Sequence, residues 1–280
     1  MSDEITIPIT RPSSAGPVPQ QISTVKSEVS YPTEVVELPS KGYFYSPDDS
    51  LSKGTVELKM MTAKEEDILT NESFIKKGIV LDRLLESLIV DKNVKIDNLL
   101  TGDKNALFIA ARRLAYGDNY GPIEVTCNSC REKSNVTIDL SEIKFKEYDF
   151  SNKQKGLNFF EFVLPYSKRV LKVKILSNKD DVDIETELKG LAKIGKSSSE
   201  VTTRLKHIIV SVDGNNDKSY IRQFVDNDLL SRDSIELRKF IRSMSPDIDL
   251  NFNFTCEHCQ AEERVGVPMT VQFFWPESGV

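Results

Sequence analysis

The chain contains four cysteines, and all four fall in two short motifs of the same form. Each motif is Cys-x-x-Cys, and 125 residues, numbers 131 to 255, separate the two motifs. The cysteines are Cys127, Cys130, Cys256 and Cys259. Because disulfides are disfavoured in a reducing compartment, we expect the four thiolates to bind one structural Zn²⁺ ion. Such a site forces two distant segments together, so it is the strongest constraint on the fold.

Each cysteine pair is predicted to lie at the tip of a β-hairpin. Residues 123–126 lead into the first pair and residues 134–140 leave it, while residues 249–255 and 264–267 flank the second pair. Two such turns complete the tetrahedron of a zinc ribbon, and four thiolates leave no open position for a water molecule. We therefore expect the metal to stabilise the fold and not to catalyse. Duplication of the motif argues against the alternative of a redox dithiol.

The residue after each cysteine pair and the two histidines of the chain are further positions that bear on a functional site. A glycine often follows a knuckle of this kind, but Arg131 and Gln260 stand at those positions. His258 lies inside the second pair, where it could donate a hydrogen bond to a thiolate or be solvated, and we favour solvation. His207 lies among apolar residues of a predicted helix, and we expect it to be partly packed.

Charge and composition exclude several classes of protein. Subtracting 43 acidic from 37 basic residues gives a net charge of −6. This balance argues against a general polyanion binder, which needs a surplus of Lys and Arg, although a local basic patch could be hidden in the average. No apolar run approaches the ~20 residues that cross a bilayer, and the N-terminal sequence lacks the features of a secretory signal. We expect a cytosolic protein that does not bind membranes.

Motifs for catalysis are missing from the sequence. It has two histidines, no glycine-rich phosphate-binding loop and no Gly-x-Ser-x-Gly. The acidic groups Glu65-Glu66-Asp67 and Asp180-Asp181 fall at predicted helix starts, where acids are favoured by the helix dipole. Arg112 and Arg113 follow an apolar helix face and are expected to be solvated or paired, with a partner-binding surface as the alternative. We therefore predict that the chain is not an enzyme.

The sequence predicts an α+β protein in four parts. Residues 1–37 are expected to be a disordered tail, because their prolines lie among Ser, Thr and Gln and few large apolar groups offset the ordering entropy. Residues 38–148 form a helical region with the first zinc knuckle, and residues 149–248 an inserted β-hairpin with helices. Residues 249–280 form the second zinc-knuckle hairpin and a C-terminal segment.

Local patterns place the elements of the first region. Residues 54–60 alternate as a strand does, and Thr62 with Glu65 forms a capping box for a helix that ends near Leu69. Apolar residues at 81, 84, 85, 88 and 89 form one helical stripe. Asp103 is expected to cap a further helix that reaches about residue 115.

The insertion is predicted to combine a hairpin with three helices. Residues 159–164 and 170–175 read as the two strands of the hairpin. The helices are expected at 180–194, 199–212 and 231–243, with a short strand or extended connection at 220–225.

Several short motifs, taken in order, resemble one family. They are Leu38-Pro39-Ser40-Lys41-Gly42-Tyr43-Phe44-Tyr45, Met60-Met61-Thr62-Ala63-Lys64-Glu65-Glu66-Asp67-Ile68-Leu69, Gly102-Asp103, Tyr116-Gly117-Asp118-Asn119-Tyr120 and Cys127-Asn128-Ser129-Cys130. In these motifs the chain resembles the baseplate hub assembly family of T-even-like contractile-tailed bacteriophages. The resemblance covers residues 35–140 well, and the rest in outline through a helix at 231–244, Ser245-Pro246-Asp247-Ile248-Asp249 and the second cysteine pair.

The resemblance implies a virus-encoded late protein that is needed while the central hub of the tail baseplate is assembled. It implies a non-enzymatic, chaperone-like assembly factor or a hub subunit that acts by protein–protein contact. The implied partners are other baseplate hub proteins, with the tape-measure protein and a second copy of the chain as further candidates. The implied location is the host cytoplasm during assembly, with the tail baseplate of the virion as the alternative.

Two short segments are candidates for the partner-binding surface. One is the aromatic cluster Tyr43, Phe44 and Tyr45, for which a place in the local core is an equally good interpretation. The other is the start of the helix after residue 62, where Glu65 and Glu66 lie.

A second functional hypothesis is a zinc ribbon that binds nucleic acid, as in a viral transcription accessory protein. Its support is the ribbon alone. The negative net charge weighs against it, and so does the small number of basic residues after the first cysteine pair, namely Arg131, Lys133 and Lys144.

Overall fold

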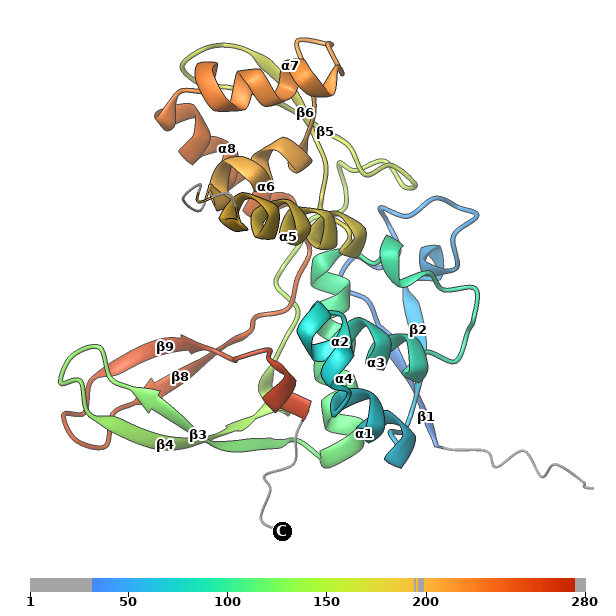
Figure 1. The fold of residues 1–280 in the computed structure, drawn as a ribbon, viewed down its shortest axis with the longest axis vertical. Helices are drawn as coiled ribbons and strands as arrows, with labels where there is room; N and C mark the ends of the chain where they lie inside the picture. The colour runs from blue at the N-terminus through green and yellow to red at the C-terminus, as the bar shows by residue number, and fades with distance from the viewer. Residues whose placement is uncertain (1–31, 194, 196–198, 275–280) are drawn as a thin grey trace, which may run out of the picture. The chain divides into compact units, whose positions relative to one another are not determined.

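The computed structural model describes residues 32–193, 195 and 199–274 (Figure 1). Residues 1–31 of the predicted tail lie outside the described residues. The tail prediction is wrong for residues 33–37, which form strand β1 (Thr33–Glu37) and pair antiparallel with β2 (Thr55–Lys59). Val36 in β1 packs against the core, which gives this short segment a reason to be ordered.

The elements follow the predicted α+β order (Figure 1). Helices α1 (Ala63–Leu69), α2 (Glu72–Lys77), α3 (Val80–Leu88) and α4 (Thr101–Tyr116) precede the first cysteine hairpin, β3 (Asn119–Thr126) and β4 (Lys133–Asp139). The insertion holds β5 (Phe160–Val163), β6 (Val170–Val173), α5 (Asn178–Lys193), α6 (Glu200–Ile208), β7 (Ile209–Val212), α7 (Lys218–Gln223) and α8 (Ser231–Met244). The second cysteine hairpin is β8 (Asn251–Thr255) and β9 (Glu262–Gly266), followed by a 3₁₀ helix, Val271–Phe274. Within the described part of the chain, no helix has both the length and the apolar character that spanning a membrane requires.

Helices α1 and α3 form as their local patterns predict. The capping box at α1 is present, with the backbone N–H of Thr62 donating to the Glu65 carboxylate at 2.9 Å. The predicted apolar stripe of α3 is confirmed, because Leu84, Leu85 and Leu88 are fully buried. Burial of leucine side chains of this kind contributes about 1.5–3 kcal/mol each to folding.

Helix α4 differs from its prediction at its first turn. The helix begins at Thr101 with Leu100 as its N-cap residue, so the prediction that Asp103 caps it is wrong. Asp103 instead lies inside the first turn, fully buried. Its carboxylate accepts hydrogen bonds from the backbone N–H of Ser40 at 2.9 Å, from the Ser40 hydroxyl at 2.6 Å and from the Tyr45 hydroxyl. The carboxylate therefore holds the segment that follows β1 against α4.

The residues beside Asp103 bind other segments. The Thr101 hydroxyl donates to the carbonyl of Leu176 at 3.3 Å, and the ammonium of Lys104 pairs with Asp82 at 2.5 Å. One turn on, the Asn105 side chain donates to Asp247 at 3.2 Å. The first turn of α4 thus joins the N-terminal region, the insertion and the segment that returns from it.

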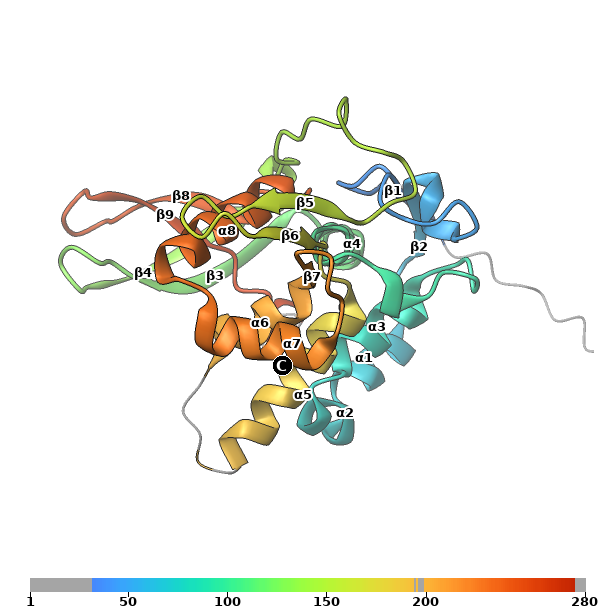
Figure 2. The ribbon, with the colours of Figure 1, turned by 90° about the horizontal axis from the view of Figure 1, so that it is seen from above.

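Two predictions for the insertion are wrong in part (Figure 2). Residues 209–212 were expected to continue a helix, but they form β7, which pairs with β6. This segment, Ile-Val-Ser-Val, is rich in β-branched residues, which favour a strand. Residues 220–225 were expected to be extended, but most lie in α7, whose N-cap Asp217 accepts a hydrogen bond from the Tyr220 N–H at 2.8 Å.

The insertion leaves and returns at one place, which we call the neck and define as residues 144–146 and 247–249. Phe145 and Ile248 form an isolated antiparallel bridge. The N–H of Lys146 donates to the carbonyl of Asp247, and the N–H of Asp249 to the carbonyl of Lys144, both at 2.8 Å. The two strands of the neck then continue toward the two cysteine hairpins.

Gly102 packs tightly against the neck, and this contact gives a testable prediction. A Cβ atom at Gly102 would lie 2.0 Å from the carbonyl oxygen of Pro246 and 2.9 Å from the Cα atom of Asp247 in the neck. We expect Gly102→Ala to lower the free energy of unfolding by about 1–3 kcal/mol, the usual cost of overpacking, as measured by denaturant titration.

The matched control is Gly190→Ala in α5. A Cβ atom there meets nothing within 4 Å, so alanine should raise the free energy of unfolding by up to about 1 kcal/mol through helix propensity. Equal stability of the Gly102→Ala variant and the wild type would contradict the prediction, because it would show that the neck moves aside for the methyl group without loss of stability.

Candidate metal centre

The two cysteine turns have the same backbone hydrogen bonds. In the first turn, the N–H of Cys127 donates to the carbonyl of Glu132 at 2.9 Å, and the N–H of Arg131 to the carbonyl of Cys127 at 3.0 Å. In the second turn, the N–H of Cys256 donates to the carbonyl of Ala261 at 3.0 Å, and the N–H four residues on donates back to Cys256 at 2.9 Å. Each cysteine pair therefore lies at a hairpin tip, as the sequence predicts.

The residue after each pair has a left-handed backbone. Arg131 has φ of 65° and Gln260 has φ of 59°. These are the two positions where a glycine is common, and the turn explains that preference because glycine enters this region without steric cost. The knuckle conformation forms here without the glycine, at a cost of about 1–2 kcal/mol per residue.

The four sulfur atoms form one compact cluster. The Sγ atoms of Cys127 and Cys259 are 3.7 Å apart, and those of Cys130 and Cys256 are 3.6 Å apart. All four Sγ atoms lie within 4.8 Å of one another. A tetrahedron of four thiolates with bonds of about 2.3 Å to Zn²⁺ has sulfurs about 3.8 Å apart, whereas a disulfide bond is about 2.05 Å long. The donor set and its spacing fit a tetrahedral metal ion.

A small apolar cluster packs the two hairpins together. Val125 and Phe254, one from each hairpin, are buried with Cys127 and Cys256. Cys130 is half-buried and Cys259 is exposed. The thiol cluster therefore has an apolar inner side and an outer side at the surface, as suits an ion that stabilises a fold.

Polar contacts cross between the hairpins on both sides of the cluster. The N–H of Asn128 in the first turn donates to the Glu263 carboxylate of β9 at 3.1 Å, and the Asn128 side chain donates to the same carboxylate. From the second turn, His258 Nε2 lies 3.3 Å from the carbonyl oxygen of Lys133. His258 is exposed, as we expected.

The thiols differ in acidity. The backbone N–H of Cys259 points to the sulfur of Cys256, and with the N–H of His258 it lowers the pKa of Cys256 to about 6. A hydrogen bond from the N–H of Glu132 also lowers the pKa of Cys130. Burial and the neighbouring cysteine sulfurs outweigh this bond, and they raise the pKa of Cys130 to about 12. Metal binding at this cluster therefore has to displace protons, because a metal ligand is a thiolate.

The predicted aromatic contact segment lies largely in the core. Phe44 and Tyr45 are buried, and Tyr43 is half-buried against the ring of Phe150 at a centroid distance of 5.0 Å. The ring of Phe44 also packs edge-on to Tyr148 at 5.9 Å. Of the two interpretations, the local core and not a partner-binding surface describes Phe44 and Tyr45, because the Asp103 contact draws Tyr45 inward.

The two acidic candidates at α1 have different environments. Glu65 is fully buried, while Glu66 is exposed. The Glu65 carboxylate accepts hydrogen bonds from Lys59 at 2.7 Å, from the Ser87 hydroxyl at 2.6 Å and from Thr62 at 2.6 and 2.9 Å. Burial raises its pKa, but these donors outweigh burial and lower the pKa of Glu65 to about 2. Glu65 is thus a structural ion that joins β2, α1 and α3, and only Glu66 of the pair can contact a partner.

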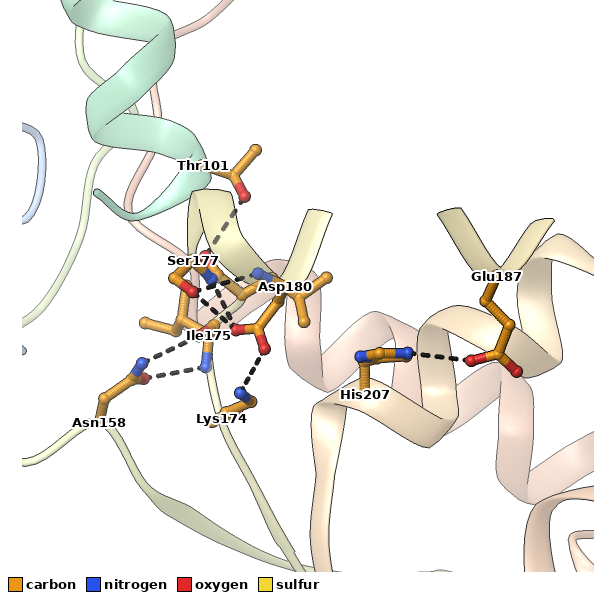
Figure 3. A network of polar contacts seen from close by, with 9 residues as sticks. Thr101, Asn158, Lys174, Ile175, Ser177, Asp180, Glu187 and His207 are labelled. Atoms are coloured by element: carbon orange, nitrogen blue, oxygen red, sulfur yellow. Dashed lines mark hydrogen bonds and ion pairs between the residues drawn. The ribbon is translucent and has the colours of Figure 1, made fainter. Parts of the chain in front are cut away.

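A second polar network joins α4 to the start of α5 (Figure 3). The Asp180 carboxylate accepts hydrogen bonds from the N–H and hydroxyl of Ser177, at 3.0 and 2.9 Å, and pairs with Lys174 at 2.7 Å. The sequence prediction that this acid supports a helix start is confirmed. Farther along, His207 Nε2 lies 3.3 Å from the Glu187 carboxylate, so the half-buried His207 is paired.

Arginines 112 and 113 have separate roles. Arg113 pairs with Asp118 at 2.6 Å, in agreement with the expectation that it is solvated or paired. Arg112 is buried, and its Nε donates to the carbonyl of Phe273 at 2.9 Å. Its guanidinium lies over the ring of Tyr116 at 4.7 Å. Arg112 therefore fixes the C-terminal segment on α4, a long-range role for which the sequence offers no signal.

Metal content and stability test the proposed ligand set. We predict that the purified chain holds one equivalent of Zn²⁺ by elemental analysis, and that Cys127→Ser or Cys256→Ser loses it. Either variant should melt at a lower temperature and should expose residues 249–280 to protease, because a structural metal couples to folding. The helices between residues 81 and 115 should keep much of their structure by circular dichroism. Reduced thiols without metal, with a melting curve that chelator does not change, would contradict the assignment.

The buried Glu65 carboxylate predicts a dependence of stability on pH. Its pKa is lowered from 4.5 to about 2, so the stability it contributes is present above pH 4.5 and is lost as the pH falls toward 2. We expect Glu65→Gln to lower the free energy of unfolding by about 2–3 kcal/mol at pH 7, the scale of hydrogen bonds to a buried charge. Denaturant titrations between pH 3 and pH 7 should show this difference shrink as the pH falls. Glu66→Gln, at an exposed side chain, is the control and should change stability by less than about 0.5 kcal/mol.

Comparison with known proteins gives one match. The family model described as T4 bacteriophage base plate protein matches residues 32–275. No curated protein and no solved structure matches the chain.

Proposed function

The chain belongs to the T4 bacteriophage base plate protein family, and from this premise we propose that it helps to build the central hub of the tail baseplate by protein–protein contact and without catalysis. The family match carries the proposal, since it spans residues 32–275 and so includes both cysteine hairpins and the whole insertion.

The chemistry of the described side chains supports a role in contact and not in catalysis. The strongest candidate site is a set of four thiolates, which closes the coordination shell of a metal. The buried carboxylates of Glu65 and Asp103 are each engaged by hydrogen bonds from several segments of the chain. These carboxylates stabilise the fold, which agrees with a chain that acts through contact.

Zn²⁺ is the ion we propose for the thiol cluster, because four cysteine thiolates in a tetrahedron are its common structural ligands. Its role would be to hold the two hairpins together. The proposed partners are other hub proteins, with the tape-measure protein or a second copy of the chain as further candidates. The proposed site of action is the host cytoplasm during assembly.

The nucleic-acid hypothesis has little support at the ribbon itself. Lys133 on β4 pairs with Glu124 at 2.7 Å, and Arg264 on β9 pairs with Asp249. Cations that are already neutralised contribute less to binding phosphates, whose affinity depends on uncompensated Lys and Arg.

Co-purification from infected cells tests the proposal. A tagged chain should recover hub proteins in a fixed ratio during tail assembly, and an untagged infected culture is the control. Probing mature virions for the chain then separates an assembly factor, which is absent, from a hub subunit, which is retained. A folded chain that recovers no baseplate protein, or that shifts in a salt-dependent manner with DNA or RNA near physiological ionic strength, would contradict the proposal.

A further inference from the structure

A groove of about 440 Å³ lies between α6, α8 and the first turn of α4. Its floor is apolar and includes Leu176, Leu205 and Ile241. Val201 on α6, also in the lining, is 47% exposed, which is a large exposure for a valine beside an apolar floor. Ordinary core packing does not fill this groove within the described residues.

The rim of the groove carries arginines with uncompensated charge. Arg238 and Arg242 on α8 are exposed, and no carboxylate pairs with either of them among the described residues. The Nε of Arg238 donates to the carbonyl of Ser234 in its own helix, at 3.3 Å. The third arginine of the rim, Arg204, is already paired with Asp181 at 3.3 Å and with Glu200.

The acids near these arginines have other partners. Asp247 at the edge of the groove pairs with Lys146 at 2.9 Å and accepts a hydrogen bond from Asn105. Glu236 on α8 pairs with Lys239 at 2.8 Å. The groove is therefore a local basic site on a chain whose net charge is −6.

We propose that this groove binds an acidic segment of a partner protein that inserts apolar side chains between α6 and α8. The inference rests on the proposed function and specifies the chemistry of the partner. Carboxylates suit the two free guanidinium groups because they form paired, charge-assisted hydrogen bonds with arginine. The apolar floor adds burial of side chains, which supplies most of the affinity in such grooves.

The apolar floor also favours a protein over a nucleic acid. A phosphate backbone needs a row of cations and gains nothing from leucine and isoleucine side chains. The groove offers two free arginines and a floor made of aliphatic groups. Its lining includes Val201 of the insertion and Asp247 of the neck, so an occupant would contact both.

Peptide binding with charge-reversed variants tests the proposal. The probes are overlapping 20-residue peptides that tile the baseplate proteins encoded by the same phage, and the full chain is the bound protein. We expect the retained peptides to be net acidic with apolar residues at helical or alternating spacing. Arg238→Glu with Arg242→Glu should weaken their binding by about tenfold or more, the scale of two lost charge-assisted hydrogen bonds.

The matched control is Arg232→Glu with Lys239→Glu. These side chains are exposed on the same helix and outside the groove lining, and the pair gives the same change in charge. Binding to this control should equal that of the wild type. Melting curves of both double variants check that the fold is retained.

Any of the following outcomes would overturn the proposal. They are retention of neutral or basic peptides, equal binding by the two double variants, and preferential binding of a 20-nucleotide DNA or RNA probe through the two arginines. If no peptide is retained although the intact chain recovers a baseplate protein, the groove proposal fails and the proposed function stands. If the intact chain recovers none, the proposed function itself fails.

Discussion

The burial of one carboxylate at the start of α4 organises the regions around it. A carboxylate in the interior is costly unless hydrogen bonds compensate it, and Asp103 receives three, from Ser40 and Tyr45. Desolvation prevails over these donors and raises the pKa of Asp103. The cost of burying Asp103 is therefore reduced only when the segment after β1 lies against α4, which makes the position of that segment a condition for burying the first turn of the helix.

The same turn of α4 contacts three other parts of the chain. Thr101 binds the start of the α5 segment, Gly102 touches the neck, and Lys104 pairs with Asp82 of α3. Because neighbouring residues on a helix point in different directions, one turn can hold several segments at once. The insertion is thus anchored at α4 as well as at the neck, and its position does not depend on the cysteine cluster alone.

Because the insertion is anchored in this way, metal binding contributes less to the free energy of unfolding than loop closure in a free chain would. A cross-link that closes a loop of this length in an otherwise free chain is worth about 4–5 kcal/mol in the chain-entropy model. Here the bridge between Phe145 and Ile248 already brings the two hairpin stems together. The loop that remains for the metal to close is short, so its entropic contribution is smaller, and the metal acts mainly on the hairpin tips, where Val125 and Phe254 form only a small core.

Local chemistry made much of the fold and of the metal centre predictable, and long-range contacts made the rest unpredictable. The cysteine spacing, the capping box at Thr62 and the stripe of α3 depend on neighbours in sequence, and the structure contains all three. The roles of Asp103 and Tyr45 could not be settled from the sequence, because their partners lie 55 or more residues away. The strand at 209–212 depends on pairing with β6, and the groove beside α8 arises only once α6 and α4 are in place.

The separation of the two cysteine turns also sets an order of events in time. At a synthesis rate of about 5–20 residues per second, the ribosome needs roughly 6–25 s to add the residues between the turns. For that period the nascent chain carries half of a ligand set, Cys127 and Cys130, and the helices from α1 to α4 are already available to fold. Completion of the thiol cluster therefore follows the synthesis of α1 to α4 and of the whole insertion, so the metal would join hairpins whose supporting segments are already available to fold.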